Sequence, residues 1–127
     1  MVGFVVFDVR DFVMKVLGRI GPAGLHRVVL ESVQEVEGQF GRPAYEWRFV
    51  IPDGEHAGSC YVLTTGTTML LGTALGDLLE QLYARPLKEG DELDPIKDFV
   101  GKQFEARAFP AGKSSGGVIK TICPVVE

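Results

Sequence analysis

Apolar residues recur with helical spacing in one stretch of the chain, Met69 to Pro86, which reads MLLGTALGDLLEQLYARP. Side chains three and four positions apart would form one wide apolar stripe: Leu70, Leu71, Ala74, Leu75, Leu78, Leu79, Leu82 and Tyr83. Pro86 cannot continue a helix, so it marks the end of this one. Gly72 and Gly76 each weaken a helix, which favours close packing against a neighbouring backbone at both positions. The pattern predicts one amphipathic helix with a buried face.

Alternation of apolar and polar residues predicts strands on both sides of this helix. Five segments show it: 25–36, 44–51, 59–65, 103–109 and 118–123. In the second segment, AYEWRFVI, four large apolar side chains share one face and are predicted to fill the core: Tyr45, Trp47, Phe49 and Ile51. The first segment keeps its apolar residues on one face only if a β-bulge falls near Ser32.

Three strands, a helix and two further strands follow one another in the order of an OB-type barrel. We therefore predict a mainly β (α+β) protein, a five-stranded OB-type barrel with one internal helix between its third and fourth strands. Residues 1–20 carry a separate apolar pattern ahead of the turn at 21–24, so we predict an N-terminal arm over 1–20 and the barrel domain over 21–127. An apolar arm on so small a domain favours a packing or subunit contact, and we expect a homo-oligomer, most simply a dimer.

Composition narrows the classes of function. The 127 residues, 46% of them hydrophobic, suit one globular domain. Apolar runs fall short of the ~20 residues that span a bilayer, and the start, MVGFVVFDVRD, lacks the basic region of a signal peptide, so we expect a cytoplasmic protein with no membrane partner. Residues 77–98 hold seven acids and three bases, which accounts for the whole net charge of −4. The rest of the chain is neutral, which permits a locally positive surface that binds nucleic acid.

Binding of single strands needs aromatic faces for base stacking and cations along the phosphates. Phe40, in a loop with two glycines, and Tyr61, on the third strand, are the candidates for stacking. Phe40 has an alternative role as a lid folded back on the barrel mouth. The candidate cations are Arg42, Arg48, Lys102, Arg107, Lys113 and Lys120. Each one alone is typical of a solvated surface charge, but loops between the first two and the last two strands of an OB-type barrel flank its binding groove.

Signatures of catalysis are missing from the sequence. Gly112-Lys113-Ser114 is not a phosphate-binding P-loop, because the required upstream glycine is Arg107 and a strand follows instead of a helix. His26 and His56 lie far apart in the sequence, without Cys, His or acid at metal-ligand spacing, so no metal or other cofactor is expected. No nucleophile motif is present either. We predict that the protein is not an enzyme.

Several short segments also resemble a known group of proteins: VEG at the end of the first strand, QFGRP, YEWRFVI, LGxxLEQL, RPL, EGDELD and FVGKQFEARA. This combination is similar to that of small OB-fold proteins of phages and prophages that are described as single-stranded-DNA-binding-like. The resemblance covers roughly residues 25–124. It implies an OB-fold and binding of single-stranded DNA alongside replication or recombination proteins. The sequence departs from the usual bacterial single-strand-binding proteins in ending CPVVE, without their acidic tail, and residues 1–20 lie outside the resemblance.

Two functions therefore stand side by side. The aromatic and basic loops favour single-stranded nucleic acid binding, of DNA in phage-type replication or recombination, without catalysis. The apolar arm and the net acidity favour the alternative, a protein-interaction or assembly accessory module built on the same barrel.

Overall fold

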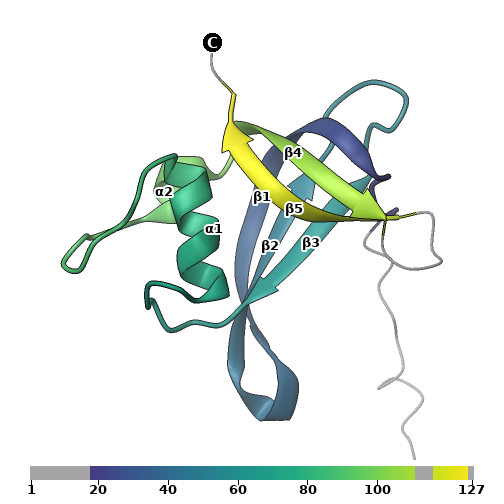
Figure 1. The fold of residues 1–127 in the computed structure, drawn as a ribbon. Helices are drawn as coiled ribbons and strands as arrows, with labels where there is room; N and C mark the ends of the chain where they lie inside the picture. The colour runs from purple at the N-terminus through teal and green to yellow at the C-terminus, as the bar shows by residue number, and fades with distance from the viewer. Residues whose placement is uncertain (1–17, 111–115, 126–127) are drawn as a thin grey trace, which may run out of the picture.

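A computed structural model describes residues 18–110 and 116–125, and one curled antiparallel sheet dominates them (Figure 1). Its named strands are β1 (Gly24–Glu37), β2 (Pro43–Val50), β3 (Cys60–Thr65), β4 (Gln103–Pro110) and β5 (Gly117–Pro124). They are hydrogen-bonded in the order β3-β2-β1-β4-β5. The predicted mainly β class is confirmed. Residues 1–17 of the predicted arm lie outside the described residues, and the boundary at residue 20 stays a prediction.

Strand β1 is long and bent, and it organises the sheet. Its first half pairs with β4 and its second half with β2. The register against β2 shifts between Leu30 and Ser32, which confirms the predicted bulge. Because a bulge adds one residue to one strand only, it bends that strand and increases its twist. The bend lets a single strand serve both halves of the curled sheet.

A short additional length of chain, residues 19–22, runs between β3 and β5. Cys60 N donates to Arg19 O at 2.7 Å, and Gly21 N donates to Cys60 O at 2.7 Å. On the other side, Gly117 N donates to Gly21 O at 2.8 Å. The half-barrel therefore has six lengths of chain where the sequence predicted five. The sixth was missed because it pairs through single bridges, too short for an alternating pattern, and Gly21-Pro22 indicated only a turn.

The main helix, α1 (Ala74–Tyr83), begins later than its apolar stripe predicted. Thr73 is its N-cap, and the Thr73 hydroxyl accepts a hydrogen bond from Gly76 N at 3.2 Å. Gly72 adopts a left-handed φ of +83°, which a helix cannot include. The apolar residues before it are exposed and outside the helix: Met69, Leu70 and Leu71. Close packing is confirmed at Gly76, where an added Cβ would lie 2.6 Å from Leu70 O, and is wrong at Gly72, where nothing lies within 4 Å.

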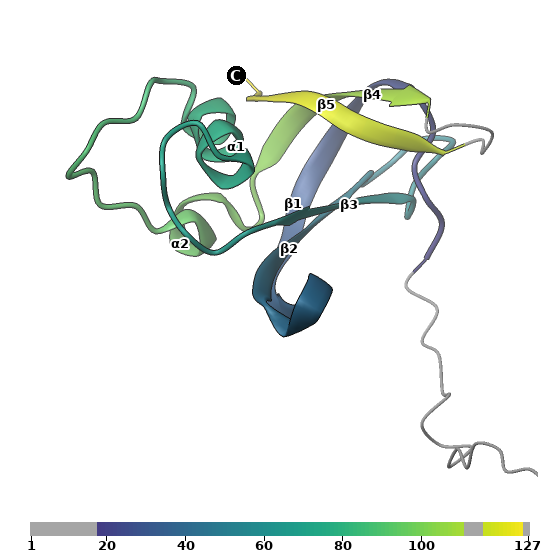
Figure 2. The ribbon, with the colours of Figure 1, turned by 60° about the horizontal axis from the view of Figure 1, so that its bottom comes forward.

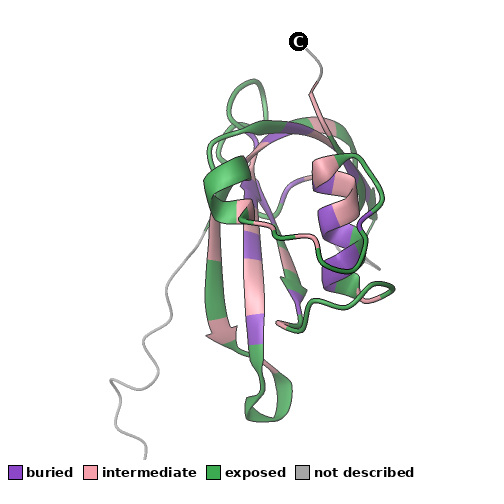
Figure 3. Ribbon diagram, turned by 90° about the vertical axis from the view of Figure 1, so that its left-hand side faces the viewer, coloured by how far each residue is buried: buried purple, intermediate pink, exposed green. Residues whose placement is uncertain are grey.

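The core lies between α1 and the concave face of the sheet. Figure 2 shows α1 and the short α2 (Pro95–Phe99) at one end of the curled sheet. The buried side of α1 faces the strands in Figure 3 and supplies Leu75, Leu78, Leu79 and Leu82. From the sheet, Trp47 and Phe49 fill the core, as the alternation in β2 predicted. The rings of Phe49 and Phe104 pack edge to face, with 6.3 Å between their centroids. No helix in the described part of the chain has the length and apolarity to cross a membrane.

Candidate nucleic-acid interface

The β1–β2 hairpin projects beyond the barrel and carries Phe40 at its tip (Figure 1). Phe40 lies in the 3-10 turn Gln39–Gly41, has a left-handed φ of 57° and ψ of 29°, and is 94% exposed. A bulky residue in this backbone region is uncommon and strained. Two backbone hydrogen bonds close the turn, Gly38 N to Arg42 O at 2.6 Å and Arg42 N to Gln39 O at 3.1 Å. The alternative in which Phe40 folds back as a lid is wrong.

Arg42 is the cation nearest to Phe40 in sequence, and it is exposed at the base of the same turn. The tip therefore presents an apolar ring and a guanidinium together, both in solvent. A nucleotide can contact both groups, because its base can stack on the ring and its phosphate can pair with the guanidinium. Phe40 and Arg42 are two residues apart in this hairpin, and Arg42 also lines a hollow with Thr73 and Leu75 at the start of α1.

The solvent face of β4 and β5 carries a second aromatic and basic group. Arg107 lies opposite Thr121 of β5, Lys120 is its exposed neighbour on that strand, and Phe109 lies opposite Val118. Phe109 is 48% exposed and was missed by the sequence analysis. A signal was available, because Phe104, Ala106 and Ala108 are buried and the alternation puts 105, 107 and 109 on the opposite face.

Arg48 lies on the predicted outer face, but Glu31 pairs with it there. Its Nε lies 3.2 Å from Glu31 Oε1, and its side chain is only 18% exposed. The carboxylate neutralises much of the guanidinium charge, and the burial limits its reach toward a phosphate. Arg48 is therefore a member of a surface ion pair across β1 and β2, which corrects its assignment as a free phosphate contact. Sequence alternation placed it correctly on the outer face but could not identify Glu31 as its partner.

Tyr61 is also corrected. It is 2% exposed, and its hydroxyl donates to Pro22 O at 2.6 Å. A Cβ added at Gly21 would lie 2.3 Å from the ring, so the glycine is what allows the backbone to pass over it. Burial raises the pKa of Tyr61. Because Tyr61 pairs with Phe49 in the register of β2 and β3, it shares the core face and offers no free surface to a base.

The remaining predicted residues are spread along the molecule. Lys102 is exposed at the turn between α2 and β4, where its carbonyl accepts from Leu30 N at 3.2 Å. Lys113 lies outside the described residues. The hairpin tip follows Glu37 at one end of β1, and Ala108 near the end of β4 pairs with Gly24 at the other end. The 14 residues of β1 would span about 45 Å if straight at ~3.3 Å each. The candidate residues therefore define an extended path and not a compact pocket.

Two histidines that are distant in sequence meet in space. The rings of His26 and His56 are 5.8 Å apart between centroids and nearly perpendicular, which shows that their sequence separation was a poor guide. No third ligand joins them: within 18–110 and 116–125, no group of three or more His, Cys, Asp or Glu is placed to hold a metal ion. Cys60 and Cys123 are both free thiols, the first buried and the second exposed.

No protein-family model matches this chain, and no curated protein matches it significantly. The resemblance to phage-type single-stranded-DNA-binding-like proteins thus rests on the quoted sequence segments alone.

Proposed function

We propose that this protein binds single-stranded nucleic acid, DNA in phage-type replication or recombination, through an OB-type barrel and without catalysis. The strand order β3-β2-β1-β4-β5, with α1 between β3 and β4, supports an OB-type barrel. The observation that carries the function is Phe40, a fully solvated aromatic ring held in a strained backbone conformation. Strain and exposure both cost free energy, so a ring kept in this state favours a role in contact with a partner.

In this proposal a base stacks on Phe40 while Arg42 meets the adjoining phosphate. The strand then follows the outer face of β4 and β5, where Arg107 and Lys120 meet phosphates, Phe109 offers a second stacking surface, and Glu105 faces Arg27 at 4.0 Å. Stacking contributes about 1–3 kcal/mol per base, and the cations supply a salt-dependent attraction. An extended path suits a single strand, because its bases are free to stack, whereas a duplex of the same length offers no free base faces and binds more weakly.

Fluorescence anisotropy with labelled oligo-dT, measured at several salt concentrations, tests the proposal. Four exposed cations are expected to meet phosphates: Arg42, Lys102, Arg107 and Lys120. Neutralising four phosphates gives a log–log salt slope of about −3, from ~0.7 per contact on single strands. Failure to bind oligo-dT at ~50 mM salt and tens of micromolar protein, where non-specific contacts normally register, would overturn the proposal.

Variants of the hairpin tip separate stacking from charge. Phe40→Asn removes the ring but suits the left-handed backbone, so it is expected to weaken binding by ~1–3 kcal/mol with the salt slope unchanged. Phe40→Tyr keeps a ring and is the matched control that should bind like the parent. Arg42→Ala is expected to reduce the slope by about 0.7, whereas Arg85→Ala, in the ion pair with Asp91, should leave it intact. Equal effects of the two arginine variants would contradict the assigned path.

A further inference from the structure

An apolar cleft of about 420 Å³ opens at the end of the molecule where the helices lie. Figure 3 views the molecule from this side. The cleft lies between α1, α2, the connections before and after α1, and the paired parts of β1 and β2. Its lining is mostly apolar and includes Val33, Tyr45, Trp47, Met69, Leu79 and Ile96. At its mouth, Met69 and Ile96 are respectively 43% and 55% exposed, so apolar surface continues from the cleft into solvent.

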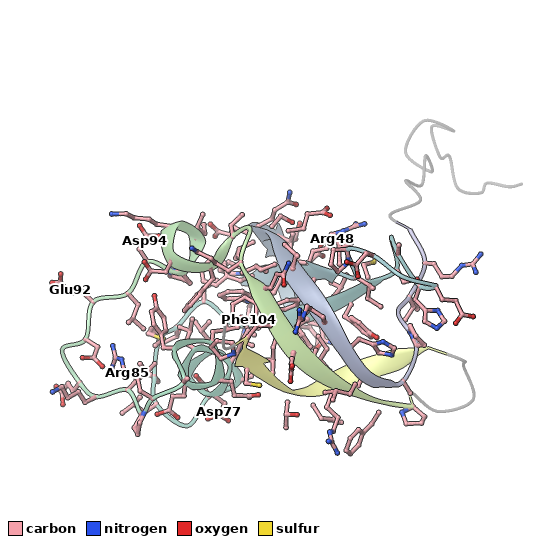
Figure 4. All side chains as sticks on the ribbon, turned by 90° about the horizontal axis from the view of Figure 1, so that it is seen from above. Arg48, Asp77, Arg85, Glu92, Asp94 and Phe104 are labelled. Atoms are coloured by element: carbon pink, nitrogen blue, oxygen red, sulfur yellow. The ribbon has the colours of Figure 1, made fainter. Side chains whose placement is uncertain are left out.

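The rim of this cleft is acidic. Asp91 and Asp94 line it, and no Lys or Arg of the described residues does. In Figure 4, Asp94 and Glu92 lie at one end of the molecule and Arg48 lies toward the other. Arg85 Nη1 lies 3.2 Å from Asp91 Oδ2 and offsets part of that charge, while Asp94 caps α2 by accepting from Lys97 N at 3.1 Å. The surrounding segment 77–98 keeps a net charge of −4.

We propose that this cleft binds a short segment of another protein, in which two or three apolar side chains are flanked by Lys or Arg. The volume accommodates a few side chains and is at the low end for ligand sites. Carboxylates at the rim repel nucleic acid and other anions and attract basic residues, so charge complementarity selects the occupant. Met69 and Ile96 extend the apolar contact outward from the buried floor.

The cleft is separate from the proposed nucleic-acid path. Phe40, Arg107 and Lys120 are absent from its lining, and no residue assigned to phosphate contact belongs to it. The inference therefore does not rest on nucleic acid binding, and either one can fail alone. If both hold, the protein would bring a basic partner segment to a single strand through two surfaces of opposite charge.

A matched pair of peptides tests the proposal on the full chain. The first is acetyl-Lys-Lys-Leu-Phe-Leu-Lys-Lys-amide, and the second replaces every Lys by Glu while keeping the apolar centre. Trp47 lines the cleft and is the only tryptophan of the chain, so its emission reports occupancy by a peptide that has none. We expect the Lys peptide to bind at least about tenfold more tightly than the Glu peptide, with an affinity that falls as salt rises.

Two substitutions of equal chemistry locate the binding. Ile96→Lys places a cation at the rim and is expected to weaken the Lys peptide by about tenfold. Leu25→Lys is the control, because Leu25 is 60% exposed on the outer face of β1, opposite Arg107 and away from the cleft. It should leave peptide affinity unchanged. Both replaced side chains are more than half exposed, so both variants should melt like the parent, and Met69→Lys provides a second rim variant.

Several outcomes overturn the proposal. Equal affinity for the two peptides, or no binding of the Lys peptide at ~1 mM, removes the charge-selected segment as the occupant. Peptide binding that persists in both Ile96→Lys and Met69→Lys places it elsewhere. Light scattering provides a last check: a parent dimer that Ile96→Lys converts to a monomer shows that a second copy of the chain covers the cleft.

Discussion

At the scale of single residues, the hydroxyl of Tyr61 joins β3 to residues 19–22 and has no role in stacking. Tyr61→Phe keeps the ring under Gly21 and removes the 2.6 Å hydrogen bond to Pro22 O. We expect a loss of about 0.5–1.5 kcal/mol in the free energy of unfolding, measured by urea denaturation, and unchanged affinity for oligo-dT. Unchanged stability together with weakened oligo-dT binding would return Tyr61 to the nucleic-acid site.

Tyr83 makes the stability of the protein sensitive to alkaline pH. Burial and the hydrogen bond that its hydroxyl donates to Asp98 Oδ2, at 2.6 Å, raise the pKa of Tyr83 to about 12. The unfolded chain releases this proton near pH 10, before the folded protein does. The free energy of unfolding should therefore be fully supported below about pH 10 and should fall between about pH 10 and 12.

Comparison with Tyr83→Phe isolates this effect. The variant has no phenolic proton at position 83, so its free energy of unfolding should fall less than that of the parent between about pH 9.5 and 11.5. Urea denaturation at both pH values measures the difference, and tyrosinate absorbance in the parent checks that a tyrosine ionises late. Identical losses in parent and variant would contradict the assignment.

At the scale of elements, α1 supplies a hydrogen-bond acceptor to the backbone of β5, as a neighbouring strand would. Gln81 Oε1 accepts a hydrogen bond from Ile122 N at 2.8 Å, so a helix side chain satisfies a backbone donor of β5. An unsatisfied buried donor costs about 1–3 kcal/mol, and we expect Gln81→Leu to lower stability by that amount. The amide of Ile122 should exchange faster with solvent in this variant by NMR. Gln81→Glu keeps an acceptor oxygen and should protect the amide; equal exchange in both variants would exclude the contact.

Elements with a repeated pattern could be predicted, and contacts between elements could not. Alternation in β2 identified Trp47 and Phe49 as core, and the same pattern located the bulge in β1, because both follow from side chains that must share one face. The late start of α1 was missed, since its apolar stripe continues into exposed residues and only the backbone of Gly72 shows the break. A hydrophobic pattern records which residues are apolar and not which of them find a partner.

The candidate site divides in the same way. The glycine-rich hairpin tip, a local property of the chain, left an exposed Phe40 and a folded-back lid as alternatives, and the structure shows the exposed ring. The role of Arg48 depends on Glu31, which strand pairing brings beside it. The role of Tyr61 depends on Pro22, which lies 39 residues earlier in the chain. The acidic cleft has no local signature, because its lining comes from the sheet, from α1 and α2, and from the connections before and after α1.

At the scale of the whole molecule, acidic and basic side chains are unevenly distributed along the chain. The segment 77–98 carries the entire net charge of −4 and lies at the helical end, which leaves the remaining chain neutral overall. Exposed Arg42, Arg107 and Lys120 lie on the sheet and its hairpin, and Lys120 shares a surface hollow with Asp77 and Gln81 of that segment. An acidic protein can attract phosphates locally in this way, at moderate affinity and with strong dependence on salt.

Two truncations distinguish closure of the sheet from self-association. Deleting 1–17 keeps residues 19–22 and their backbone hydrogen bonds to Cys60 and Gly117, so we expect its melting temperature to stay near that of the parent. Deleting 1–22 removes three hydrogen bonds of 2.7–2.8 Å and the acceptor of the Tyr61 hydroxyl, and it opens the edges of β3 and β5. This variant should therefore melt at a lower temperature and aggregate.

If the apolar arm mediates the predicted dimer, light scattering should show a monomer already after deletion of 1–17. The role of the arm would be refuted if the parent is itself a monomer, or if a dimer survives this deletion. The melting temperatures test the closure by residues 19–22 independently.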